Sequence, residues 1–319
     1  MKPKTLRQAV VIGTGQMGPG IAYTLASAGL NVTLCGRSPE SMEKGMAAVR
    51  RGAGLLAAEG IITEEFQESV FSRISGTYQP EPVLPTADLV IESIVEDLSI
   101  KQALFSRIEP LCPVDALLTS NTSGLPATRL ASSLKHPGRF AVTHFWNPPH
   151  LMPLVEVVKG ENTSPDTVDV LLTLLKTAGK KPVAVLKDTP GQLGNRLFHA
   201  LIREGIHIVE EGIATAGDVD VAASYGFGRR LPAYGVLTHQ DAVGLDMVYA
   251  IQSYLCRSLC NATEPAAVLK EKVESSELGV KSGRGFFDWK KRDIREIVEK
   301  RDRFLVDLLK SEKDEQTGK

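Results

Sequence analysis

The sequence predicts an α/β protein with a doubly wound, mostly parallel sheet, followed by a second, all-α domain. Short β-branched runs alternate with helical stretches up to about residue 190, a rhythm typical of a parallel sheet with helices on its faces. A glycine-rich turn directly follows the first of these runs. Beyond residues 188–191 the strand pattern disappears and helical periodicity continues to the end of the chain.

The strands are predicted from short apolar runs rich in valine, isoleucine and threonine. These runs are residues 9–12, 32–34, 89–91, 117–119, 140–142, 155–158 and 183–185. Between the second and third runs lies a helical stretch, at about residues 40–71, that is broken near Gly60. Thr63 begins a second helix there, so we expect a helical hairpin inserted into the sheet topology.

The chain has 319 residues, which exceeds the size at which one hydrophobic core usually stops growing. We therefore predict two domains, residues 1–189 for the sheet and residues 190–319 for the helices. In the last helix apolar residues recur at helical spacing between charged ones, which indicates a face packed on protein. They are Ile294, Ile297, Val298, Leu305, Leu308 and Leu309.

The composition is that of an ordinary globular protein, with 43% hydrophobic residues, 24% charged residues and a net charge of -1. No strongly basic balance indicates nucleic-acid binding. No apolar run of signal-peptide or membrane length follows the N-terminus, and the four cysteines form no CxxC pair. We expect a cytoplasmic protein that neither binds a metal nor spans a membrane.

A GxGxxG motif, residues 13–18, stands between the first strand and the first helix. Gly13 allows the tight turn, Gly15 lets the backbone approach a pyrophosphate, and Gly18 lets helix and strand pack closely. Gln16 and Met17 lie within the same turn. The strand, turn, helix and strand order predicts a Rossmann-type dinucleotide site, to which we assign all five residues.

The end of the second strand lacks the acid that usually binds the ribose, because Cys35 and Gly36 stand where it is expected. Arg37 and Ser38 follow them. A guanidinium and a hydroxyl suit a 2'-phosphate, so the cofactor is either NAD or NADP. Alternatively, Arg37 stacks on the adenine or lies in solvent.

His144 ends one predicted strand, and Glu156 interrupts the apolar pattern of the next. A histidine at the carboxyl edge of a doubly wound sheet lies where such sheets bind ligands, and imidazole is a suitable base for alcohol oxidation. A carboxylate in an apolar strand needs a partner, and pairing with His144 would fix the imidazole tautomer. The alternatives are a structural histidine and a glutamate at the surface of an edge strand.

Five motifs together resemble the L-3-hydroxyacyl-CoA dehydrogenase family. They are Ser-Asn-Thr-Ser at residues 120–123, His-Phe-Trp-Asn-Pro at 144–148, Leu-Val-Glu-Val at 154–157, Lys-Asp-Thr-Pro-Gly at 187–191 with Asn-Arg at 195–196, and Lys-Ser-Gly-Arg-Gly-Phe at 281–286. Their order and spacing agree with the family from about residue 8 to residue 289. The resemblance implies hydride transfer between a nicotinamide cofactor and the 3-hydroxyl of an acyl-CoA, as in fatty acid metabolism.

The resemblance also implies roles for individual residues. His144 would be the general base, Glu156 its partner, and Ser123 and Asn195 the donors to substrate oxygens, with Ser123 also at the cofactor. The remaining residues that the resemblance places at the cofactor are Glu96, Lys101, Asn147 and Lys281. Without the resemblance, Ser123 and Asn195 read equally well as helix caps. The family further implies a helical domain that forms a homodimer, and a substrate cleft between the two domains.

Two departures from the family pattern concern the substrate. Beyond Arg50 and Arg51, the segment 50–60 has no basic residue and is apolar except for Glu59, whereas family members that act on coenzyme A thioesters tend to carry basic residues in this hairpin. His150 resembles the pattern of relatives that oxidise carboxylates without coenzyme A, although an exposed loop histidine is an equally good interpretation.

Three functions are therefore considered. The first is an NAD(P)-dependent 3-hydroxyacyl-CoA dehydrogenase. The second keeps the same catalytic residues but acts on a free 3-hydroxy acid or on an aromatic alcohol or aldehyde acid. The third is a dinucleotide-binding sensor without activity, against which the presence of both His144 and Glu156 argues.

Overall fold

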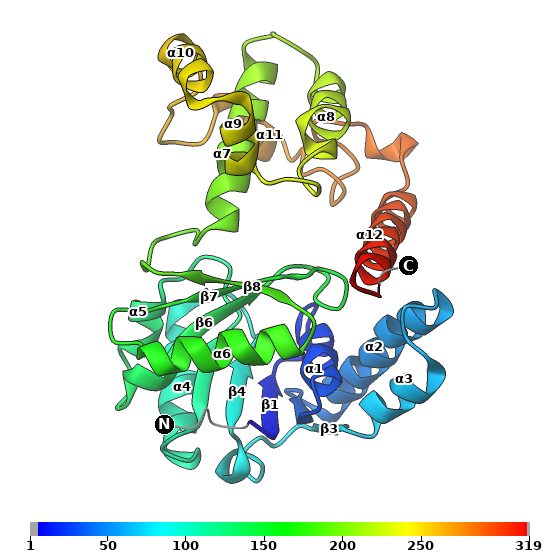
Figure 1. The fold of residues 1–319 in the computed structure, drawn as a ribbon, viewed down its shortest axis with the longest axis vertical. Coiled ribbons are helices and arrows are strands. Elements are labelled where there is room, and N and C mark those ends of the chain that lie inside the picture. The colour runs from blue at the N-terminus through cyan, green and yellow to red at the C-terminus, as the bar shows by residue number, and fades with distance from the viewer. Residues whose placement is uncertain (1–5, 318–319) are drawn as a thin grey trace. The chain divides into compact units, whose positions relative to one another are not determined.

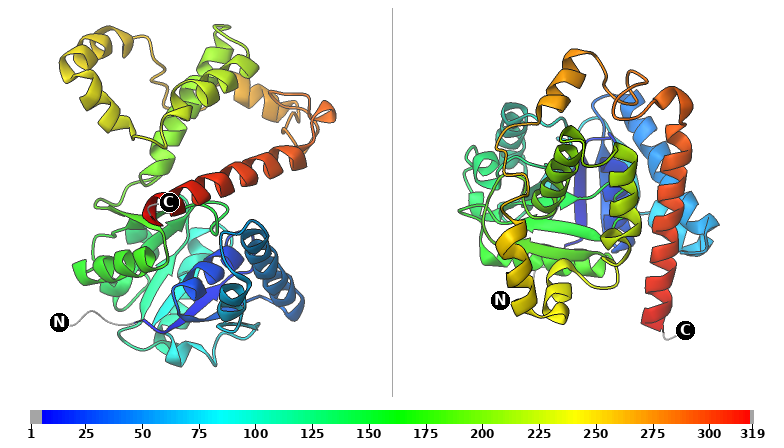
Figure 2. Two further views of the ribbon diagram at one scale, coloured as in Figure 1. Left: turned by 45° about the vertical axis from the view of Figure 1, so that its right-hand side comes forward. Right: turned by 90° about the horizontal axis from the view of Figure 1, so that it is seen from above.

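The computed structural model describes the backbone of residues 6–317 and the side chains of residues 6–313. The chain divides into two compact units. The first comprises the described residues up to 195 together with those from 300 onward, and the second comprises residues 196–299. The first unit contains the whole sheet, and the second is helical (Figures 1 and 2).

One eight-stranded sheet forms the centre of the first unit, in the order β3-β2-β1-β4-β5-β6-β7-β8. The strands are β1 (Gln8–Ile12), β2 (Asn31–Cys35), β3 (Ile74–Thr77), β4 (Leu89–Glu92), β5 (Leu117–Ser120), β6 (Phe140–Phe145), β7 (Leu154–Val158) and β8 (Lys181–Val185). All pairings are parallel except that of β6 with β7. The predicted fold class and all seven predicted strands are confirmed.

Helices cover both faces of this sheet, as a doubly wound fold requires. Those of the first unit are α1 (Gly18–Ser27), α2 (Pro39–Ala58), α3 (Glu64–Phe71), α4 (Leu98–Ile108), α5 (Ala127–Ala131) and α6 (Pro165–Thr177). Alternate residues of each strand point to opposite faces, so Val11 packs in the core with α1, α2, α3 and α6, and Val10 packs with α4 and α5.

The predicted helical hairpin between β2 and β3 is confirmed as α2 and α3. The Ser38 hydroxyl caps α2 by accepting from the backbone N–H of Ser41. The Thr63 hydroxyl caps α3 by accepting from the N–H of Phe66. Both contacts satisfy amides that a helix start leaves without partners.

The second unit contains α8 (Ala216–Tyr225), α9 (Val236–Val243), α10 (Leu245–Leu255) and α11 (Ala267–Glu274). Two helices join it to the first unit, α7 (Gly194–Glu210) and α12 (Ile294–Thr317). The C-terminal part of α12 belongs to the first unit, where Val306 is buried in the core and Lys310 pairs with Glu59 at 2.8 Å. The sequence-based division placed this segment in the helical domain, so the two divisions differ here.

No helix within residues 6–317 combines the length and the apolar character needed to cross a bilayer.

Candidate active site

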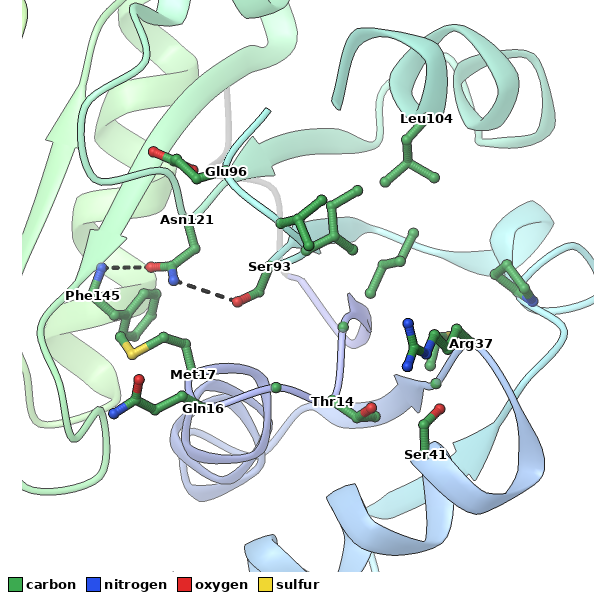
Figure 3. A pocket seen from close by; sticks show the side chains of 18 of the residues that line it. Thr14, Gln16, Met17, Arg37, Ser41, Ser93, Glu96, Leu104, Asn121 and Phe145 are labelled. Atoms are coloured by element: carbon green, nitrogen blue, oxygen red, sulfur yellow. Dashed lines mark hydrogen bonds between the residues drawn. The ribbon is translucent and has the colours of Figure 1, made fainter. Parts of the chain in front are cut away.

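A cavity of about 1120 Å³ lies at the carboxyl ends of β1, β2, β4, β5 and β6. This is the edge where doubly wound sheets bind ligands. In Figure 3 the cavity extends from Asn121 and Phe145, past the glycine turn at Thr14, to Arg37 and Ser41. Its volume exceeds the roughly 300–1,000 Å³ of most small-molecule pockets, which suits an extended ligand.

The glycine turn forms the floor of this cavity. Gly13 has a φ of 123°, and a Cβ there would lie 2.2 Å from the backbone oxygen of Ser93. Gly18 packs against Gly13, where a Cβ would lie 1.8 Å from its oxygen. Beside Gly15, in contrast, a Cβ would meet nothing within 4 Å. The open space over Gly15, next to the start of α1, is what a pyrophosphate needs, so these residues fit a dinucleotide.

Replacing Gly13 and replacing Gly15 by alanine should therefore have different effects. Gly13→Ala should lower the free energy of unfolding by about 2–4 kcal/mol, because the left-handed backbone and the contact with Ser93 both become strained. Gly15→Ala should change it by less than about 1 kcal/mol but weaken dinucleotide binding at least tenfold. Urea unfolding and calorimetric titration with NAD measure the two effects. Equal effects of the two variants would contradict this division.

The far end of the cavity, beyond the turn, is lined by Arg37, Ser41 and Glu81. Burial raises the pKa of the Cys35 thiol to about 12, and the negative charge of Glu81 adds to the rise. The Glu81 carboxylate therefore lies near the end of β2. The Ser38 side chain is not among the lining residues, because it is engaged in capping α2.

At the opposite end, His144 and Glu156 face each other across the β6–β7 pair. They are register partners in the antiparallel pairing, and His144 Nδ1 lies 2.7 Å from Glu156 Oε2. His144 also lines the cavity, although only 5% of it is exposed. With Nδ1 bound to the carboxylate, Nε2 is the nitrogen left for a ligand.

Glu156 is completely buried and accepts hydrogen bonds at both of its oxygens. Oε2 accepts from His144 and from Trp146 Nε1 at 3.0 Å, and Oε1 accepts from the backbone N–H groups of Leu193 and Gly194, each at 2.9 Å. Burial raises the pKa of Glu156, but these bonds outweigh that effect and lower it to about 2. The carboxylate is therefore ionised at neutral pH.

The start of α7 completes this arrangement. The two amides that bind Glu156 belong to the segment where α7 begins, and a helix N-terminus favours negative charge. A Cβ at Gly194 would lie 2.5 Å from Trp146 Cζ2, so the absence of a side chain lets the helix approach.

The low pKa of Glu156 makes stability depend on pH. Its pKa rises from about 2 in the folded protein to its ordinary 4.5 on unfolding, so its contribution is present above pH 4.5 and is lost as the pH falls toward 2. The full contribution is about 3 kcal/mol. The difference in free energy of unfolding between the wild type and Glu156→Gln should therefore narrow between pH 5 and pH 3 in urea titrations. A constant difference would mean that Glu156 is not ionised.

Glu96 connects the cavity wall to the 120–123 segment. One of its oxygens accepts from the Thr122 hydroxyl and, at 3.0 Å, from the backbone N–H of Ser123. Lys101 lies 3.4 Å from the other oxygen of Glu96 and 2.5 Å from Glu92. Lys101 is only 1% exposed and is not among the lining residues, so its contact with the site runs through Glu96.

Four further polar residues line the cavity, namely Ser93, Asn121, Ser123 and Asn195. Asn195 Nδ2 donates to the backbone oxygen of Ser123 at 2.9 Å, which holds these two predicted substrate ligands together. Asn121 accepts from the N–H of Phe145 at 2.8 Å and lies 3.5 Å from the Ser93 hydroxyl (Figure 3). Within the described residues, no group of three or more possible metal ligands is present.

Comparison with known proteins identifies this architecture. Residues 8–189 match the family model described as "3-hydroxyacyl-CoA dehydrogenase, NAD binding domain", and residues 191–289 match its C-terminal domain. The chain belongs to the 3-hydroxyacyl-CoA dehydrogenase family. The family resemblance predicted from the motifs is thus confirmed, and the chain is a dehydrogenase of the type that acts on hydroxyl groups.

The relatives of the chain within this family have different substrates. A 5-formyl-3-hydroxy-2-methylpyridine 4-carboxylate 5-dehydrogenase from Mesorhizobium japonicum is 34% identical over 94% of this chain and 96% of its own. A probable 3-hydroxybutyryl-CoA dehydrogenase from Bacillus subtilis is 36% identical over 90% of this chain and 99% of its own.

Solved structures similar to this chain also include enzymes with these two kinds of substrate. A structure of an NAD+-dependent 5-formyl-3-hydroxy-2-methylpyridine 4-carboxylic acid 5-dehydrogenase has a TM-score of 0.89 at 34% identity, and covers 95% of this chain and 97% of its own. The (S)-3-hydroxybutyryl-CoA dehydrogenase from Ralstonia eutropha has a TM-score of 0.74 at 31% identity, and covers 89% of this chain and 99% of its own.

The cavity thus gathers most of the residues predicted for a member of this family. The predicted residues that line it are Gly13, Gly15, Gln16, Met17, Arg37, Glu96, Ser123, His144, Asn147 and Asn195. Four further predicted residues do not line the cavity but contact residues that do, namely Gly18, Ser38, Lys101 and Glu156. Lys281 belongs to the second unit, and its cofactor contact stays a prediction.

Sequence reasoning missed three residues of this site: Glu81, Asn121 and Glu92. Glu92 is completely buried and binds Lys101, the Ser120 hydroxyl and the N–H of Ile94. Glu156 was predicted because it is a carboxylate within an apolar strand, and the same signal is present at Glu92, the last residue of the apolar strand β4.

Proposed function

We propose that the protein catalyses NAD-dependent oxidation of a CH–OH group in an acyl substrate, with His144 as the base. The observation that carries the proposal is the buried His144–Glu156 pair at 2.7 Å, whose imidazole lines the same cavity as the glycine turn. When bound, the nicotinamide supplies a carbon that accepts the hydride. The protein must then provide a base for the hydroxyl proton and donors for the substrate oxygens.

The contacts support a role for each of these residues. His144 Nε2 takes the hydroxyl proton, and the ionised Glu156 stabilises the imidazolium that forms. One N–H of the Asn195 amide is bound to Ser123, so its second N–H and the Ser123 hydroxyl are placed to bind substrate oxygens. Glu96 holds the Ser123 segment in position and lines the cofactor side.

Two substrate classes fit this machinery. The first is a 3-hydroxyacyl-CoA, as in the relatives named 3-hydroxybutyryl-CoA dehydrogenases. The second is a free 3-hydroxy acid or an aromatic alcohol or aldehyde acid. The second is favoured by the similarity to the pyridine carboxylate dehydrogenase, with its TM-score of 0.89, and by the apolar 50–60 segment.

A substrate panel tests the proposal. Purified protein is assayed for NADH formation with 3-hydroxybutyryl-CoA, 3-hydroxybutyrate, carnitine, gulonate and hydroxymethylpyridine carboxylates. If the protein oxidises any of these compounds and the His144→Gln variant does not, the result supports the proposed oxidation with His144 as the base. If the protein binds NAD but oxidises none of them, a dinucleotide-binding sensor becomes the better description.

We expect NAD rather than NADP, because a carboxylate stands at the end of the cavity where Arg37 lies. The Glu81 carboxylate can accept a hydrogen bond from a ribose hydroxyl, the role usually played by an acid at the end of the second strand, where this chain has Gly36. Its negative charge also repels a 2'-phosphate. The ratio of kcat/KM for NAD over NADP should exceed ten, and Glu81→Gln should reduce it at least threefold. Equal use of the two cofactors by the wild type would instead support the phosphate-binding interpretation of Arg37.

We also propose that the protein is a homodimer that associates through the second unit. Several large apolar side chains of this unit are exposed in the monomer, including Leu237 at 79%, Tyr249 at 77% and Leu245 at 63%. Exposed apolar surface of this kind marks interaction sites. Light scattering on the full chain gives the oligomeric state directly, and a monomer at micromolar concentration would contradict the proposal.

A further inference from the structure

A second, smaller cavity of about 280 Å³ adjoins the first. It lies between α1, α2 and the segment that connects β6 to β7, and Arg51, Gly52, Pro149 and His150 are among its lining residues. Gln16 lines both cavities, and the consecutive residues Asn147 and Pro148 line the larger and the smaller one respectively. The two cavities are therefore neighbours that share a wall at Gln16 and at the step from Asn147 to Pro148.

His150 is held in this cavity by its packing on α2. A Cβ at Gly52 would lie 3.4 Å from Cε1, Nδ1 and Nε2 of the His150 ring, so the ring lies over α2 where the helix has no side chain. The following residue, Leu151, is 1% exposed and anchors the segment in the core. His150 is therefore a fixed part of the cavity wall and not an exposed loop histidine.

The charges around His150 are predominantly positive. Arg51 lines the cavity, and Lys180 lies beneath it, donating to the backbone oxygens of Pro149 at 2.5 Å and Met152 at 3.0 Å. Asp302 is the nearby acid, and it is paired with Arg301 at 2.6 Å. Among the side chains that the structure describes, Arg51 and Lys180 have no carboxylate within ion-pair distance, whereas the neighbouring Lys181 pairs with Glu312.

Burial and the positive charges of Lys180 and Arg301 lower the pKa of His150, although Asp302 acts in the opposite direction. Burial also lowers the pKa of Lys180 to about 8. At neutral pH His150 is therefore a neutral donor, and most of the Lys180 population is charged. A guanidinium, an imidazole N–H and a nearby ammonium together match the requirements of a carboxylate.

We propose that this second cavity binds the carboxylate of the substrate, with Arg51 and His150 as its ligands, and that the natural substrate is a small free acid. The inference rests on the proposed oxidation and specifies its substrate class. A cavity of about 280 Å³ accommodates a carboxylate on a small aliphatic or aromatic skeleton. Such a substrate carries no coenzyme A, for whose phosphates the mostly apolar 50–60 segment offers few cationic ligands.

Binding measurements test the carboxylate site independently of turnover. The probes are isonicotinate and 3-hydroxybutyrate, each compared with its neutral amide, titrated calorimetrically into the full chain with saturating NAD. At least one acid should bind ten or more times tighter than its amide. Arg51→Gln should remove this preference, and His150→Leu should reduce it at least threefold.

Arg50→Gln is the matched control, because Arg50 is adjacent in sequence but stacks 5.7 Å from the centre of the Phe71 ring and lines neither cavity. Its acid preference should stay within twofold of the wild type. The proposal is overturned if neither acid is preferred over its amide, or if Arg50→Gln and Arg51→Gln weaken binding equally. Thermal unfolding of each variant separates loss of binding from loss of fold.

Activity provides the second arm of the test. Free acids should be oxidised with a higher kcat/KM than 3-hydroxybutyryl-CoA, and Arg51→Gln should reduce the values for the acids only. Preferred turnover of the thioester, unaffected by Arg51→Gln, would overturn the proposal while leaving the oxidation intact. If Arg51-dependent acid binding is found without any NADH formation, the proposed oxidation fails and the carboxylate site stands.

Discussion

Replacing His144 by glutamine should lower kcat by about 10²–10⁴-fold, one of the two largest effects that we expect from a single substitution. Glutamine has a similar size and can still hydrogen-bond to Glu156, but it cannot accept the hydroxyl proton. The base is lost, whereas the glycine turn that holds the dinucleotide is unchanged. The measurement is kcat with the best substrate of the panel, alongside the Kd for NAD from calorimetry.

NAD affinity serves as the internal control in this experiment. We expect the Kd of the variant to stay within about threefold of the wild-type value, since Phe145, the neighbour of His144 in the chain, lies at the end of the cavity opposite Arg37 (Figure 3). Near-normal turnover would show that another group takes the proton. A parallel loss of NAD binding and kcat would instead indicate that His144 only supports the fold.

Glu156→Gln should reduce kcat by about 10²–10⁴-fold and move the acid limb of the pH profile to lower pH. The carboxylate stabilises the imidazolium that forms when the imidazole takes the hydroxyl proton, and the neutral amide of glutamine does not. With a pKa of about 2, Glu156 stays ionised throughout the assay range and does not itself shape the profile. The measurement is kcat/KM between pH 5 and pH 10.

Asp88→Asn is a suitable control for the loss of a carboxylate in the same sheet domain. Asp88 binds the backbone N–H groups of Arg7 and Gln8 at the opposite, amino-terminal end of β1. Its replacement should leave the pH profile in place. An acid limb that does not move in Glu156→Gln would show that the two side chains of the pair are not coupled in catalysis.

The sequence predicted the interior of the sheet well, because buried parallel strands are continuous apolar runs. It missed β3, whose four residues Ile-Ser-Gly-Thr contain only one large apolar side chain and lie at the edge of the sheet. It also could not assign the end of α12 to the first unit. The apolar spacing around Leu305 indicates a packed face, but periodicity does not identify the surface on which that face packs.

The pairing of His144 with Glu156 was predictable because a histidine and a glutamate both interrupt apolar strands. The position of Lys101 was not, since its burial depends on Glu92 and Glu96, which come from other parts of the chain. Glu81 was missed for a related reason. It follows β3 and reaches the end of β2 only through the sheet order, which brings β3 beside β2.

The reversal of direction between β6 and β7 limits how the connecting segment, residues 146–153, can evolve. Side chains alternate along a strand, so shifting β7 by one position would bring Val155 or Val157 to the place of Glu156 and turn the carboxylate to the other side of the sheet. Surface loops ordinarily tolerate insertions and deletions. Here a change of length that moved β7 by one residue would separate the histidine from its acid.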